Sequence, residues 1–158
     1  MMEVKGVLYE DYVNYKKPSM VIMFPKCTFK CEKESGCGIC HNSALAKAPS
    51  IMTPISELIY HYMKNPFTQA IVFSGLEPFD STSDVLYFIE QFRKQSSDDV
   101  VIFTGYTEEE LNYLIPELKK YENIYIKFGR FIPNQNKHYD EVLGIDLASD
   151  NQYGKKIS

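Results

Sequence analysis

Four cysteines in one short segment are the residues of this sequence best suited to chemistry. Cys27, Cys31, Cys37 and Cys40 fall within fourteen consecutive positions. Thiolates are soft ligands that select zinc or iron–sulfur clusters, and closely spaced cysteine pairs suit both kinds of centre. All four follow an apolar run, at residues 20–24, that is typical of a buried strand. The spacing therefore predicts a metal centre in a loop at a strand end, and it supports zinc and an iron–sulfur cluster about equally.

The composition is that of an ordinary globular chain. It has 158 residues, of which 44% are hydrophobic and 24% are charged, and this suits a single domain, 1–158, with one core. The formal net charge is −4, so no basic surface for nucleic acid is expected. No apolar stretch approaches the roughly 20 residues of a membrane span, and the first residues lack a signal-peptide pattern. We therefore expect a cytoplasmic protein, in which clustered cysteines bind metal more often than they form disulfides.

Amphipathic stretches alternate with short apolar runs through the middle of the chain. Helices are expected from Thr53, from about Ser81 and from Thr107, because a capping side chain precedes an apolar stripe of helical spacing in each case. The runs expected to form strands are 20–24, 70–73, 100–103 and 124–128. This alternation predicts an α/β fold with a mostly parallel sheet. A complete eight-stranded barrel needs at least roughly 200 residues, so an open partial barrel or a small doubly wound sheet remains.

The chain turns polar from about Pro133 onward. We expect an irregular C-terminal segment there, in which residues 142–145 pack locally because they are its only apolar run. The Gly154-Lys155-Lys156 sequence is expected either to contact an acidic partner or to fray.

Three further strand ends carry small motifs of their own. Ser74-Gly75-Leu76-Glu77-Pro78 follows the second predicted strand, and Thr104-Gly105-Tyr106-Thr107 follows the third. Gly129-Arg130 follows the fourth. Each of the first two motifs alone is typical of an ordinary strand-to-helix turn, and Arg130 is expected either to bind a carboxylate or to be a solvated surface charge. Because ligand sites of parallel α/β folds lie at the carboxyl ends of the strands, we expect these residues and the cysteines to share one site.

Taken together, the motifs resemble those of the radical S-adenosylmethionine superfamily, and within it the activating proteins of anaerobic (class III) ribonucleotide reductases. The cysteine segment is similar to that family's Cys-x₃-Cys-x₂-Cys loop, and Cys40-His41-Asn42 is similar to its ending. Residues 74–78 resemble the family's Gly-Gly-Glu-Pro motif, which meets the methionine amino group. Residues 103–106 resemble its aromatic-Thr-Gly-Tyr strand end. The resemblance covers about residues 20–132.

The resemblance implies a small open partial (β/α) barrel that holds a 4Fe-4S cluster and S-adenosylmethionine. Three cysteines would ligate the cluster and leave one iron open. We assign Cys27, Cys31 and Cys40, with Cys37 as the alternative ligand in a set of Cys31, Cys37 and Cys40. No catalytic residue is assigned beyond the cluster and its ligands. The residues expected to bind the cofactor are Asn42, Ser74, Gly75, Glu77, Thr104 and Gly105.

The implied activity is reductive cleavage of S-adenosylmethionine, followed by formation of a glycyl radical on a partner, the anaerobic ribonucleoside-triphosphate reductase. A one-electron donor such as flavodoxin or ferredoxin is the second expected partner. Two alternatives stay open. One is a radical enzyme that acts on a small molecule, as a carboxy-deazaguanine synthase does. The other is a non-catalytic zinc or iron–sulfur binding module.

Overall fold

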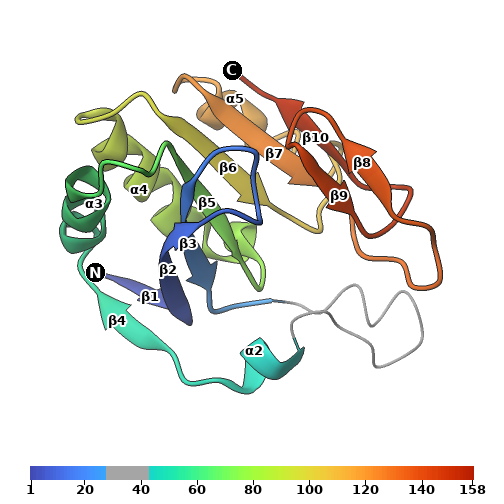
Figure 1. The fold of residues 1–158 in the computed structure, drawn as a ribbon, viewed down its shortest axis with the longest axis horizontal. Helices are drawn as coiled ribbons and strands as arrows, with labels where there is room; N and C mark the ends of the chain where they lie inside the picture. Colours follow the sequence, from blue (N-terminus) through green and yellow to red (C-terminus); the bar gives the residue numbers. More distant parts are fainter. Residues whose placement is uncertain (28–42) are drawn as a thin grey trace.

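The computed structural model describes residues 1–27 and 43–158 of the chain (Figure 1). The strands are β1 (Met2–Val4), β2 (Gly6–Asp11), β3 (Ser19–Phe24), β4 (Ile51–Thr53), β5 (Ala70–Gly75), β6 (Asp99–Phe103), β7 (Ile124–Phe128), β8 (His138–Asp140), β9 (Ile145–Leu147) and β10 (Tyr153–Lys156). The helices are α2 (Ser43–Lys47), α3 (Ile55–Lys64), the 3₁₀ helix η1 (Pro78–Ser81), α4 (Thr82–Arg93) and α5 (Ile115–Leu118).

A six-stranded sheet in the order β10-β7-β6-β5-β3-β2 forms the centre of the described structure (Figure 1). The four inner strands are parallel to one another, and the two edge strands, β2 and β10, are antiparallel to their neighbours. Within the described residues the sheet does not close on itself. The predicted α/β fold with a mostly parallel sheet is therefore confirmed.

Each face of the sheet packs against a different layer. One face carries large side chains, among them Ile22, Phe73 and Ile102, and packs against α3, α4 and the segment that contains α5. The other face carries the small side chains Ala70 and Val72 and is covered by Tyr15 and by Leu143 and Leu147 of the C-terminal segment. Strands buried on both faces read as continuous apolar runs, which is why the sequence located them.

The third predicted helix is much shorter than expected. The Thr107–Glu110 capping box is present, since the Thr107 N–H donates to Glu110 at 3.0 Å and the Glu110 N–H donates to the Thr107 hydroxyl at 3.2 Å. Residues 108–114 nevertheless form turns, and regular α-helix is limited to Ile115–Leu118. Pro116 explains the difference, because proline has no N–H to donate and its ring crowds the carbonyl four residues earlier.

The first two helices begin close to where they were expected. The N-cap of α3 is Pro54, and Thr53, the predicted cap, is instead the last residue of β4. The second helix is preceded by η1, which starts at Pro78.

The C-terminal segment is not irregular, contrary to the prediction for residues from about 133. It forms the β8–β9 hairpin and then β10, which pairs with β7 along Tyr153–Lys156. The Lys155 ammonium lies 2.9 Å from the Glu108 carboxylate. An edge strand keeps one side in water and so tolerates polar residues, which is why hydrophobicity alone did not reveal β10. Residues 142–145 were predicted to pack locally, but Leu143 is instead fully buried against the central sheet, in a cluster with Val21 and Val72.

None of the helices in the described part of the chain has the length and apolar character that a membrane crossing requires.

We predict that Phe88→Ala lowers the free energy of unfolding by about 3–5 kcal/mol, because it would open a cavity between the rings of Phe73 and Phe92. Phe88 is fully buried in α4. The matched control is Tyr87→Ala in the same helix, where the side chain is 52% exposed and the change should stay within about 0.5 kcal/mol. Urea denaturation of both variants checks this. Equal losses would contradict the layer assignment.

Candidate functional site

A cavity of about 440 Å³ lies where the carboxyl ends of β3, β5, β6 and β7 meet. Its lining includes all the predicted site residues that the structure describes, which are Cys27, Ser74, Gly75, Glu77, Thr104 and Gly105. The expected meeting of these strand ends is thus observed. The remaining predicted residues, Cys31, Cys37, Cys40 and Asn42, lie outside the described residues.

Gly75 brings the turn after β5 directly against the end of β3. Its φ is +84°, and a Cβ atom there would lie 2.6 Å from the backbone nitrogen of Phe24. Only glycine fits both the left-handed backbone and this close approach. Beyond it, the Leu76 N–H donates to the Phe24 carbonyl at 3.1 Å and the Glu77 N–H donates to the Lys26 carbonyl at 2.7 Å. The segment that carries Cys27 is therefore hydrogen-bonded to the β5 turn.

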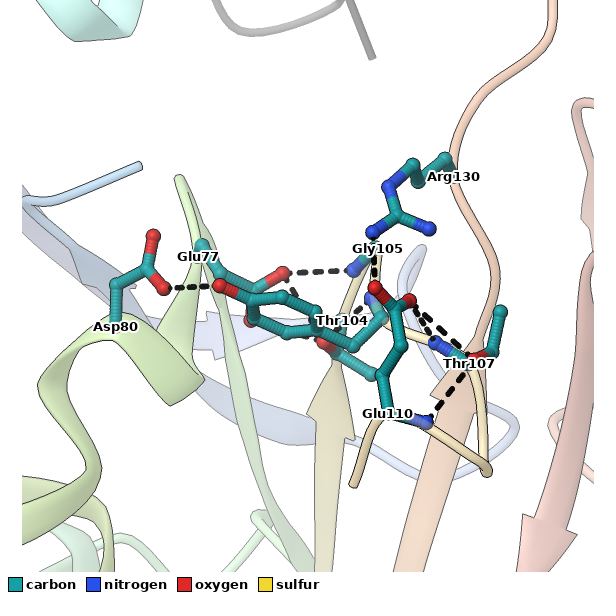
Figure 2. Close-up of polar contacts among 8 residues, drawn as sticks. Glu77, Asp80, Thr104, Gly105, Thr107, Glu110 and Arg130 are labelled. Atoms are coloured by element: carbon teal, nitrogen blue, oxygen red, sulfur yellow. Dashed lines mark hydrogen bonds and ion pairs between the residues drawn. The ribbon is translucent and has the colours of Figure 1, made fainter. Parts of the chain in front are cut away.

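The Glu77 side chain connects the same turn to the end of β6 (Figure 2). Its carboxylate accepts the Gly105 N–H at 2.7 Å and the Thr104 hydroxyl at 2.9 and 3.0 Å. The carboxylate also accepts the N–H of Phe79, at 3.0 Å, and so caps the start of the 3₁₀ helix η1. Glu77 thus fixes the relative positions of two of the predicted cofactor-binding turns.

Burial gives Glu77 unusual acid–base properties. The side chain is almost fully buried, and this loss of hydration raises the pKa of Glu77 to about 7. The hydrogen bonds from Gly105, Phe79 and Thr104 act in the opposite direction, and the negative charge of Asp80 raises the pKa further. The carboxyl group consequently titrates near neutral pH.

A second set of contacts joins the outer rim of the site (Figure 2). The Tyr106 hydroxyl donates to Asp80 at 2.5 Å, and the Arg130 guanidinium lies over the Tyr106 ring, 5.8 Å from its centre. Arg130 also contacts the Glu110 carboxylate at 2.6 Å. The arginine after the fourth predicted strand is therefore engaged within the chain, as one part of the contacts between the loops after β5, β6 and β7.

Sequence reasoning missed several residues that line the cavity. Lys127, in β7, is 9% exposed and its ammonium donates to the Gly129 carbonyl at 3.1 Å. Residues 145–148 and Gln152 come from the C-terminal segment. A single lysine in an apolar run does not indicate a functional site. The C-terminal residues were missed because their polarity predicted an irregular segment.

The cysteine donors fit an iron–sulfur centre. Cys27 is half-buried directly beyond β3 and lines the cavity. Three more thiols follow it within the next thirteen positions, and thiolates are the usual ligands of 4Fe-4S clusters. Among residues 1–27 and 43–158 alone, no group of three or more cysteine, histidine or acidic side chains is placed to hold a metal ion.

The fold and site define an open α/β protein in which a cysteine lines a cavity formed by strand ends. The model of the family described as "4Fe-4S single cluster domain" matches residues 19–152. This chain belongs to that family, which is found in radical S-adenosylmethionine-type iron–sulfur proteins. No curated protein and no solved structure matches the chain. Family membership favours a 4Fe-4S cluster over zinc, the choice that cysteine spacing had left open.

We predict that Gly75→Ala lowers the free energy of unfolding by at least about 2 kcal/mol, because alanine is strained at this φ and its Cβ would press on the β3 backbone. Gly105→Ala is the matched control in the next turn. A Cβ there meets its nearest neighbour at 3.5 Å, which is ordinary contact, so its loss should stay within about 1 kcal/mol. Denaturant titration of both variants measures the difference, and similar losses would show that the close approach is not required.

We predict that the stability of the chain depends on the ionisation of Glu77. Its pKa is about 7 in the folded chain against 4.5 ordinarily. The folded state thus holds the proton more tightly, and this stabilisation is complete below pH 4.5 and lost as the pH rises through 7. Relative to Glu77→Gln, the wild-type free energy of unfolding should fall by about 3 kcal/mol between pH 4.5 and pH 8. Urea titrations across this range measure the difference, and a constant difference would refute the assignment.

Proposed function

We propose that this protein is a radical S-adenosylmethionine activase, which cleaves S-adenosylmethionine reductively at a 4Fe-4S cluster and generates a glycyl radical on an anaerobic ribonucleotide reductase. One observation carries the proposal. The strand end that bears Cys27 shares a single cavity with Ser74, Gly75 and Glu77 and with Thr104 and Gly105, the described residues that the resemblance assigns to the cofactor. Membership of the 4Fe-4S family supports it independently.

In this proposal Cys27, Cys31 and Cys40 hold the cluster. When bound, a cluster with three thiolate ligands supplies one electron to S-adenosylmethionine. The turn at residues 74–77 and the turn at residues 104–105 bind and orient the cofactor. A cavity of about 440 Å³ is in the usual range for a site that binds one small molecule. The Glu77 hydrogen bonds keep both turns in a fixed relative position, so that little reorganisation is needed when the cofactor enters.

We further propose that the sheet is a small partial barrel of the radical S-adenosylmethionine type. Two features support this. The parallel strands β3, β5, β6 and β7 lie in sequential order, and α3, α4 and the α5 segment share the core on one face. Successive right-handed crossovers onto the same side of a sheet are the way a barrel is built.

The proposed partners are the glycyl-radical subunit of the reductase and a one-electron donor such as flavodoxin or ferredoxin, in the cytoplasm. The carbon that loses hydrogen would be the Cα of a glycine in the partner protein. We propose no nucleic-acid partner, because a chain with a net charge of −4 lacks the excess of basic residues on which such binding depends.

The test is anaerobic reconstitution of the chain with iron and sulfide, followed by assay of S-adenosylmethionine cleavage and EPR of the reductase. We expect about four irons per chain, cleavage to methionine and 5′-deoxyadenosine, and a glycyl radical signal. Cys27→Ala should lose both iron and cleavage, whereas the matched variant Cys37→Ala should retain both. The reverse pattern would contradict the ligand assignment.

Two other outcomes separate the alternatives. Cleavage without a glycyl radical on the reductase would contradict the activase and favour a radical enzyme that acts on a small molecule, such as a carboxy-deazaguanine synthase-like protein. A colourless chain with stoichiometric zinc after anaerobic purification would contradict the radical reaction altogether and favour a binding module.

A further inference from the structure

The first five residues of the chain lie against both ends of the cysteine-bearing segment. β1 pairs antiparallel with β4, so that Met2, Glu3 and Val4 oppose residues 51–53. Met2 and Val4 are fully buried in the main core. The N-terminus is therefore held firmly next to the part of the chain that follows the cysteines, and Figure 1 shows β1 and β4 side by side with α2 beyond them.

Lys5 extends this arrangement to the part of the chain that precedes the cysteines. Its backbone N–H donates to the Met23 carbonyl at 2.7 Å, four residues before Cys27. Its ammonium donates to the Ala46 carbonyl at 3.4 Å and to the Ala48 carbonyl. One residue thus hydrogen-bonds to β3 ahead of the cysteines and to the end of α2 behind them.

The chemistry of these contacts favours a lasting attachment. The last carbonyls of a helix have no partner within the helix and carry a partial negative charge, so a lysine ammonium is well suited to bind them. Lys5 is half-buried, so water and salt screen the contact less than they would at an exposed site.

We propose that Lys5 is a positioning residue for the metal centre. Lys5 hydrogen-bonds to both Met23 and Ala46, and the segment between these two residues carries all four cysteines. Several thiolates on one length of chain can meet a single cluster only if that chain gives up conformational freedom. Fixing both ends of the segment in advance reduces that cost. The proposal depends on the 4Fe-4S centre that the family implies and not on the proposed activity.

A merely structural role for Lys5 makes a different prediction. If Lys5 served only to hold α2 and β1 on the core, its loss would lower the free energy of unfolding. Any other variant with the same loss of stability would then release the cluster at the same rate. If Lys5 positions the segment, its loss acts on the cluster beyond the effect on stability.

The experiment compares Lys5→Met with Lys5→Arg, which keeps the positive charge, in the full reconstituted chain. Cluster loss to an iron chelator is followed by absorbance near 400 nm, and the reduced cluster is examined by EPR. Lys5→Met should lose its cluster about tenfold faster than the wild type, the effect of one charge-assisted hydrogen bond, and its EPR signal should broaden. Lys5→Arg should stay within about threefold of the wild type.

Two controls make the result decisive. Val85→Ala removes buried methyl groups from α4, an element to which Lys5 makes none of its hydrogen bonds among the described residues. Lys120→Met removes an exposed lysine paired with Glu117. Both should lose the cluster at about the wild-type rate. The proposal is overturned if Lys5→Met also keeps the wild-type rate, if Val85→Ala loses its cluster as fast as Lys5→Met, or if Lys5→Arg is as impaired as Lys5→Met.

Discussion

The site depends on the hydrogen bonds of one buried residue, Glu77. Its backbone N–H is bonded to Lys26, next to Cys27, while its side chain accepts donors from Thr104 and Gly105 at the end of β6. A single residue therefore fixes three chain segments that are distant in sequence. Burying a carboxylate is costly unless its oxygens are hydrogen-bonded, and here they accept bonds from three different residues. The raised pKa shows that these bonds offset the loss of hydration only in part. Residual destabilisation of this kind is common where a protein needs fixed geometry at a site.

The parallel strands allow one such residue to act on so many elements. Neighbouring parallel strands end at the same edge of the sheet, so the turns after β3, β5 and β6 meet without any long connection. Gly75 then permits the β5 turn to approach β3 closely enough for the Leu76 and Glu77 N–H groups to reach it. The rim contacts of Tyr106 with Asp80 and Arg130 extend the same cross-linking to β7. The site is thus formed by the ends of the parallel strands and the turns that follow them. The helices contribute to it indirectly, because they form the core that holds the strands in place.

The sequence predicted the parts of this arrangement that depend on local patterns. The four inner strands were found because burial on both faces demands continuous apolar runs, and the turns were found because glycine and hydroxyl residues mark strand ends. The prediction of a full third helix from Thr107 was wrong. Leu111, Leu114, Ile115 and Leu118 recur at helical spacing, and this pattern concealed the effect of Pro116, whose missing N–H acts at a single position. β10 and the β8–β9 hairpin were missed because pairing with β7 depends on tertiary contact and leaves little hydrophobic signal. Lys127 was missed for a similar reason, since its place in the cavity depends on the strands and loops that surround the end of β7 and not on its sequence context. The choice among the four cysteines stays a prediction, because three of them lie outside the described residues.

The polar C-terminal segment, for which low hydrophobicity suggested an irregular structure, forms part of the wall of the cavity. The sheet face opposite the helices carries small side chains such as Ala70 and Val72, which are fully buried under Leu143 and Leu147 of this segment. A segment that covers a sheet face beside a cavity must do so without leaving its own N–H and carbonyl groups unsatisfied. Gln152 meets this requirement. Its amide oxygen accepts the N–H groups of Ala148 and Ser149, and its amide nitrogen donates to Gly129 at the end of β7. An apolar residue at this position could fill the same space but could not bind the cover to the strand ends. The C-terminal segment is therefore polar because it lines the cavity and must hydrogen-bond to the strand ends. The same polarity led to the prediction of an irregular structure.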